Sequence, residues 1–118
     1  MRQPDDRALL LDMLLAAREA RALAAGSTRE SLAEDRVLFL ALQKLVENIG
    51  EAASRLSEGA RSTLPVLPWK DIVGMRHRLV HDYMRVDLDR VWLVIETDLD
   101  ALIAEIEHRG ITPEPEGA

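Results

Sequence analysis

The chain contains no cysteine, only four aromatic side chains and no long uninterrupted run of apolar residues. Without cysteine it has neither a disulfide framework nor a thiolate that could act as a nucleophile or hold a metal. No segment approaches the roughly 18 consecutive apolar residues of a membrane span, and the N-terminus lacks the apolar stretch of a signal peptide. These absences predict a soluble, cytoplasmic protein with no membrane partner.

The composition favours helices over a sheet. Hydrophobic residues make up 47% of the 118 positions and aromatic residues only 3%, with leucine and alanine abundant. A sheet draws instead on β-branched and aromatic residues. The length fits one domain, and it is short enough that a homodimer would usefully bury more surface.

The charge is unevenly distributed. A net charge of −6 argues against non-specific coating of nucleic acid, which depends on neutralising phosphates, so no DNA partner is expected. Residues 61–90 nevertheless carry six basic side chains against four acidic ones, a local charge of +2, which leaves −8 for the rest. A localised phosphate contact and ordinary scatter of charge both explain this.

Four segments repeat apolar residues at helical spacing. We expect the first helix to begin at Pro4, where proline and two acidic residues suit a helix start. The predicted helices cover Pro4–Ala25, Arg29–Ser57, Trp69–Asp82 and, capped by Asp87, residues 88–109.

Short links between four amphipathic helices predict an all-α, up-down antiparallel four-helix bundle. The longest irregular connection is expected at residues 58–68, which contain Gly59, Pro65 and Pro68. We place the single domain at residues 1–110 and a flexible tail at residues 111–118. Gly50, in the second helix, indicates either a close backbone approach or a tolerated surface glycine, which costs about 1 kcal/mol relative to alanine.

The third predicted helix departs from the amphipathic pattern, because a charged residue falls on its apolar face. Arg76 falls near the middle of an apolar face, where an unpaired charge is costly unless a partner or an interface satisfies it. His81 lies about 140° around the helix from Arg76 at 3.6 residues per turn. The two residues can act together only if the helix distorts or a second copy completes the site.

Single residues in this helix have ordinary explanations. His77 and His81 have the i, i+4 spacing of metal ligands, but the sequence offers no evident third ligand, so no metal is expected. Tyr83 suits the packing of a helix end, and Arg78 with Asp82 suits a surface ion pair. These readings leave the function open.

Taken together, the residues resemble a known family. Arg76, His81 and Tyr83 form the Arg-x4-His-x-Tyr motif of HepT-like toxins in the HEPN superfamily. Other landmarks follow in the family's order: Asn48-Ile49-Gly50-Glu51-Ala52-Ala53, then the segment from Leu67-Pro68-Trp69 to Met75-Arg76, then Val86-Asp87 before Val91-Trp92. The resemblance covers residues 35–105. His77 is a departure, because asparagine is common after the arginine in relatives.

The resemblance implies a HEPN-like fold and a metal-independent ribonuclease, without a cofactor, that is the toxin of a toxin–antitoxin pair. Its substrate would be RNA, such as tRNA or mRNA. His81 would be the general acid or base and Arg76 would stabilise the transition state, at a composite site between the two chains of a homodimer.

The resemblance also implies an off-switch. An MNT-type nucleotidyltransferase antitoxin would add AMP to Tyr83, and His77, Asp82, Glu51 and Asn48 would be accessory residues around the site. Two alternatives remain open. One is a non-catalytic helical dimer that docks the nucleotidyltransferase, and the other is a metal-dependent enzyme that uses His77 and His81.

Overall fold

The computed structural model describes residues 5–74 and 88–113, and this part of the chain is helical without any strand. The all-α prediction is therefore confirmed for these residues. None of the helices in the described ranges is long and apolar enough to cross a membrane. The elements are α1 (Asp6–Ala24), α2 (Arg29–Glu34), α3 (Arg36–Arg55), α4 (Glu58–Ser62), a helical stretch at residues 69–74, α6 (Leu88–Leu93), the π-helical turn η2 (Val94–Asp98) and α7 (Leu99–His108).

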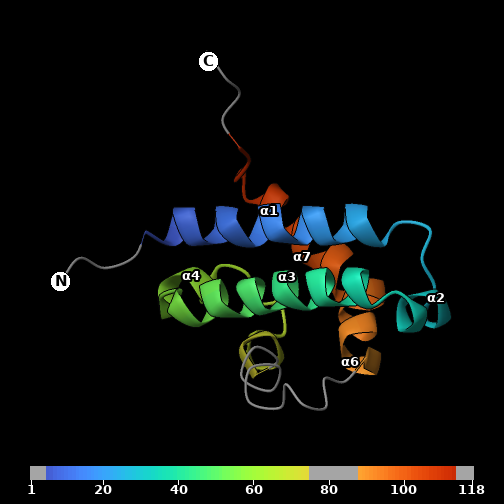
Figure 1. The fold of residues 1–118 in the computed structure, drawn as a ribbon. Coiled ribbons are helices and arrows are strands. Elements are labelled where there is room, and N and C mark those ends of the chain that lie inside the picture. The colour runs from blue at the N-terminus through green and yellow to red at the C-terminus, as the bar shows by residue number, and fades with distance from the viewer. Residues whose placement is uncertain (1–4, 75–87, 114–118) are drawn as a thin grey trace.

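The long helices α1 and α3 run antiparallel, side by side, and α7 packs against α1 (Figure 1). The helical stretch 69–74 lies on the side of α3 away from α1, and α6 lies on that side too (Figure 1). The predicted up-down bundle includes residues 75–87, which lie outside the described residues. Its full topology therefore stays a prediction.

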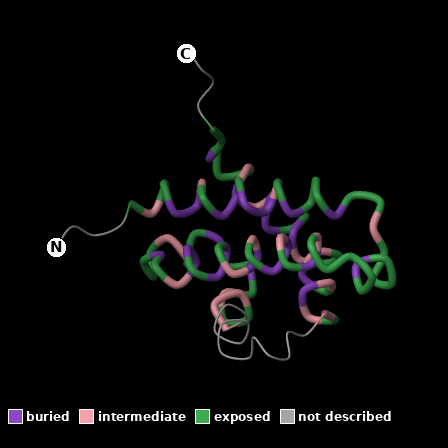
Figure 2. Tube along the Cα trace, viewed as in Figure 1, coloured by how far each residue is buried: buried purple, intermediate pink, exposed green. Residues whose placement is uncertain are grey.

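The core lies where α1, α3 and α7 meet, as the buried stripes along these helices show (Figure 2). The apolar stripe predicted for the first helix is confirmed, because every member is buried: Leu10, Met13, Leu14, Ala17, Ala20 and Ala24. Burying a leucine or methionine side chain contributes about 1.5–3 kcal/mol. The fully buried large side chains include Met13, Leu14, Leu42, Leu99 and Ile106.

The prediction of one continuous helix from Arg29 to Ser57 is wrong, because the chain breaks at Asp35. The Asp35 backbone leaves the helical region (φ −114°, ψ 87°), and its carboxylate accepts a hydrogen bond from the Leu38 N–H at 3.0 Å. The Asp35 N–H donates to the Leu32 carbonyl at 3.1 Å. Asp35 therefore ends α2 and caps α3, and a cap of this kind is worth about 1 kcal/mol.

Two other segments depart from the expected pattern. The connection predicted as irregular contains the short helix α4, capped by the Ser57 hydroxyl, which accepts from the Ala60 N–H at 3.0 Å. The last predicted helix contains a π-turn, closed by the Leu99 N–H donating to the Val94 carbonyl five residues back. Thr97 donates its hydroxyl to the Leu93 carbonyl at 2.6 Å, a back-bond that bends helices.

The start of α1 is tied to the end of α3. The Asp6 carboxylate accepts from the Ser57 hydroxyl at 2.6 Å and from the Ser57 N–H at 3.0 Å. Since both bonds favour the charged carboxylate, the side-chain bond most, the pKa of Asp6 is lowered below its ordinary value of 3.8. The contribution of this carboxylate to stability is therefore present above that value and is lost as the pH falls through the lowered pKa.

We predict that Asp6→Asn reduces the acid sensitivity of the fold. Between pH 6 and pH 2 the melting temperature of the variant should fall less than that of the wild type, because asparagine does not titrate. Melting curves at several pH values measure this. Ser57→Ala serves as the matched variant and should also flatten the acid slope, whereas an unchanged slope in both variants would contradict the assignment.

Candidate functional site

The motif residues Arg76, His77, His81, Asp82 and Tyr83 all lie in the segment 75–87, outside the described residues. The metal alternative, which needs His77 and His81, lies there too and is not tested. The structure instead describes how the chain enters this segment at residues 69–74 and how it leaves at α6. Both ends are fixed by side-chain contacts to other elements.

The entry is fixed by Trp69, the first residue of the helical stretch 69–74. Its indole N–H donates to two backbone carbonyls, those of Arg61 at 3.1 Å and Leu64 at 3.0 Å. Trp69 is partly buried and packs against the core. Just before it, Leu64 and Leu67 are buried, so the turn leading into the helix is held by apolar packing as well as by hydrogen bonds.

Arg61 links the same turn to α3. Its Nη2 atom donates to the carbonyls of Ala53 at 3.0 Å and Ser54 at 3.2 Å, at the carboxyl end of α3. A guanidinium there satisfies carbonyls that lack partners within the helix and complements the negative end of the helix dipole. The buried Arg61 Nε has no hydrogen-bond partner among residues 5–74 and 88–113.

An ion pair between two exposed side chains lies at the exit. The Arg29 guanidinium, at the first residue of α2, donates to the Asp89 carboxylate in α6. This hydrogen bond is the main reason why the pKa of Asp89 is lowered below 3.8. Asp89 lies two residues after the motif segment, so the ion pair links α2 to the chain where it leaves that segment.

An apolar pocket of about 220 Å³ lies between α3, residues 66–72 and the start of α7. Its rim includes Val66, which is 71% exposed, and Leu93, which is 54% exposed, beside the π-turn. Asp71 and Asp98 also line it. Its volume is below the 300–1,000 Å³ typical of ligand sites, so it suits an apolar side chain better than a small molecule.

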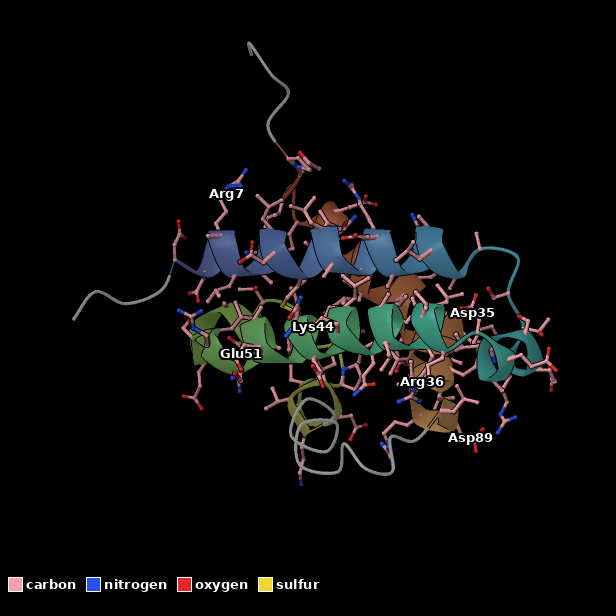
Figure 3. All side chains as sticks on the ribbon, viewed as in Figure 1. Arg7, Asp35, Arg36, Lys44, Glu51 and Asp89 are labelled. Atoms are coloured by element: carbon pink, nitrogen blue, oxygen red, sulfur yellow. The ribbon has the colours of Figure 1, made fainter. Side chains whose placement is uncertain are left out.

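Asn48 and Glu51 lie elsewhere on α3. Both are exposed and line an open groove of about 340 Å³ between α1 and α3. Figure 3 shows Glu51 on α3, toward the α4 end of the helix. Val46 lines the apolar pocket next to the motif's entry. Asn48 is about 160° around the helix from Val46 and therefore lies on the other side of α3. The accessory role of Asn48 and Glu51 stays a prediction.

Sequence reasoning missed a buried amide on α3. Gln43 is only 8% exposed, and its Nε2 donates to the Glu47 carboxylate at 3.5 Å. Within the part of the chain that the structure describes, its buried Oε1 has no hydrogen-bond partner. Gly50 is two turns further along the same face and is also buried, so the alternative of a surface glycine is wrong. The sequence signal for this buried amide was a glutamine within the apolar stripe of Phe39, Leu42 and Val46.

Comparison with known proteins gives a consistent family. The family model HepT-like, described as "Ribonuclease HepT-like", matches residues 13–109. The chain is 27% identical over 107 residues to "Putative RNase MJ1380" of Methanocaldococcus jannaschii, covering 91% of this chain and 98% of that protein. It is 33% identical over 83 residues to "Putative RNase TTE0752" of Caldanaerobacter subterraneus subsp. tengcongensis, covering 70% and 74%.

A third relative carries the family's name. The chain is 30% identical over 73 residues to "Probable ribonuclease HepT" of Thermococcus cleftensis, covering 62% of this chain and 66% of that protein. No solved structure matches the chain.

Proposed function

Because the chain belongs to the ribonuclease HepT-like family, we propose that it is a metal-independent endoribonuclease whose site is shared by two copies of the chain. The observation that carries this proposal is the Arg-x4-His-x-Tyr motif of Arg76, His81 and Tyr83, which falls inside the matched residues 13–109. The relatives named as RNases support RNA as the substrate.

The residue chemistry fits RNA cleavage by internal attack. The 2′-oxygen attacks the adjacent phosphorus, the bond to the 5′-oxygen breaks, and the leaving oxygen takes up a proton. The His81 imidazole takes the proton from the 2′-hydroxyl or gives one to the leaving oxygen, since histidine titrates near neutral pH. The Arg76 guanidinium offers a fixed fork of donors to the extra negative charge on the phosphorane.

A shared site follows from helix geometry. Were the predicted helix regular through Asp82, Arg76 and His81 would point about 140° apart and could not both reach one phosphate. A second copy of the chain supplies the missing partner if the two motif segments face each other across a homodimer. This arrangement also gives Arg76, which the sequence places on an apolar face, an interface in which to lie.

We further propose that the chain is the toxin of a toxin–antitoxin pair, neutralised at Tyr83. An MNT-type nucleotidyltransferase would transfer AMP from ATP: the Tyr83 oxygen attacks the α-phosphorus, pyrophosphate leaves, and the phenolic proton goes to solvent. The added phosphate lies two residues from His81 in the chain. There it competes with the RNA phosphate for Arg76 and fills space that the substrate needs.

The ribonuclease proposal predicts that the purified protein cleaves RNA in the presence of EDTA. Arg76→Ala and His81→Ala should each lower the cleavage rate at least 100-fold, the scale of losing a general acid–base group or a transition-state donor. Gel-resolved cleavage of labelled RNA measures the rate, and circular dichroism checks folding.

Two matched variants control for charge and histidine content. Arg78→Ala removes the arginine two residues from Arg76, and His108→Ala removes an exposed histidine at the end of α7. Both should keep wild-type cleavage. Full activity in Arg76→Ala and His81→Ala would refute the catalytic assignment of these two residues. No cleavage by the wild type would favour the non-catalytic dimer, and loss of activity with EDTA would favour a metal-dependent enzyme.

The off-switch proposal predicts a modification on the chain's only tyrosine. Co-expression with an MNT-type nucleotidyltransferase encoded beside it should add the mass of AMP and abolish RNA cleavage. Tyr83→Phe should remain unmodified and active under the same conditions, because phenylalanine lacks the accepting oxygen. Intact-mass spectrometry measures both, and modification that persists in Tyr83→Phe would place the acceptor elsewhere.

A further inference from the structure

We propose that Trp69 is a positioning residue of the ribonuclease site, which it serves by fixing the rotation of the helix that leads toward Arg76. The Trp69 indole and the Arg61 guanidinium together join the start of this helix to the carboxyl end of α3. The inference rests on the proposed roles of Arg76 and His81. It adds a residue outside their motif on which their alignment depends.

Two hydrogen-bond steps make the connection. The Trp69 indole N–H lies 3.1 Å from the Arg61 carbonyl and 3.0 Å from the Leu64 carbonyl, a three-centre bond that sets the plane of the ring. Arg61 in turn donates to the carbonyls of Ala53 and Ser54. The start of this helix is thereby joined to α3, which is itself buried against α1.

The Trp69 bond is not needed to satisfy the backbone. The Arg61 carbonyl also accepts from the Leu64 N–H at 3.0 Å, and the Leu64 carbonyl also accepts from the Leu67 N–H at 3.2 Å. Both oxygens therefore keep a donor when the indole N–H is removed. The turn can form without this bond, and what is lost is the direction that the bond gives to the Trp69 ring and to its helix.

A small rotation of the helix that begins at Trp69 would displace the motif residues enough to slow catalysis. Arg76 follows Trp69 by seven residues, close to two helical turns, so the two share a face if the helix extends as the sequence predicts. With side chains about 5–6 Å from the helix axis, a rotation of about 10° moves a side-chain group by about 1 Å. A misplacement of that size at a catalytic group costs up to about 100-fold in rate.

The test compares Trp69→Phe with Trp92→Phe. Trp92 is the chain's other tryptophan and also packs, partly buried, against the core, so both variants make the same substitution at a partly buried site. Trp69→Phe should lower kcat for RNA cleavage about tenfold while KM stays within about twofold. Trp92→Phe should leave both constants within about twofold, and melting curves should show both proteins folded.

A second pair of variants tests the Arg61 step. Arg61→Lys keeps a cationic donor near the carbonyls of α3 and should retain most of the rate, whereas Arg61→Met should lower kcat as Trp69→Phe does. Equal kcat in Arg61→Met and the wild type would overturn the part of the proposal that assigns Arg61.

A readout independent of activity completes the experiment. In NMR spectra of the imidazole groups, Trp69→Phe should shift the signals of His81 and leave those of His108, at the end of α7, unchanged. A folded Trp69→Phe with wild-type kcat and unshifted His81 signals would overturn the proposal. If the wild type cleaves no RNA, the proposed function fails, and the His81 signals alone decide whether Trp69 positions the motif.

Discussion

Burial of the apolar stripes of α1 and α3 against each other holds the described part of the chain together. Met13 and Leu14 from α1 and Leu42 from α3 are fully buried, and α7 closes over the pair with Leu99 and Ile106. Burial of each side chain contributes about 1.5–3 kcal/mol, which makes α3 a stably packed reference for the shorter elements. The turn at residues 56–69 depends on that reference, because Arg61 and the buried leucines attach it to the end of α3.

The motif segment is joined to this frame at both ends. Trp69 and Arg61 hold its entry to α3, and the Arg29–Asp89 pair holds its exit to α2. A site completed by two copies of a chain needs such anchoring, since each copy must present its arginine and histidine in a fixed direction. The family membership supports a ribonuclease, and the frame suits the proposal that each chain presents half of its site.

Sequence patterns predicted the helices well where burial alone decides the structure. The stripe from Leu10 to Ala24 lies buried in α1, and the stripe from Leu88 to Ile106 packs against the core. The break at Asp35 escaped prediction because an aspartate fits a solvated helix face as well as it fits a cap. The two hydrogen bonds of the Trp69 indole were not predicted. Their acceptors are backbone carbonyls, which every residue has and which a pattern of side chains therefore does not reveal. The motif itself was found only as a combination, since each residue has an ordinary role alone.

The most direct test of a shared site is complementation between inactive variants. Arg76→Ala and His81→Ala would be unfolded together, refolded as a mixture and assayed for RNA cleavage in EDTA, beside each variant refolded alone. A mixed dimer carries one intact arginine and one intact histidine on opposite chains. The account predicts that the mixture regains activity that neither variant has. A mixture that forms mixed dimers yet stays as inactive as its components would contradict a site shared between two chains.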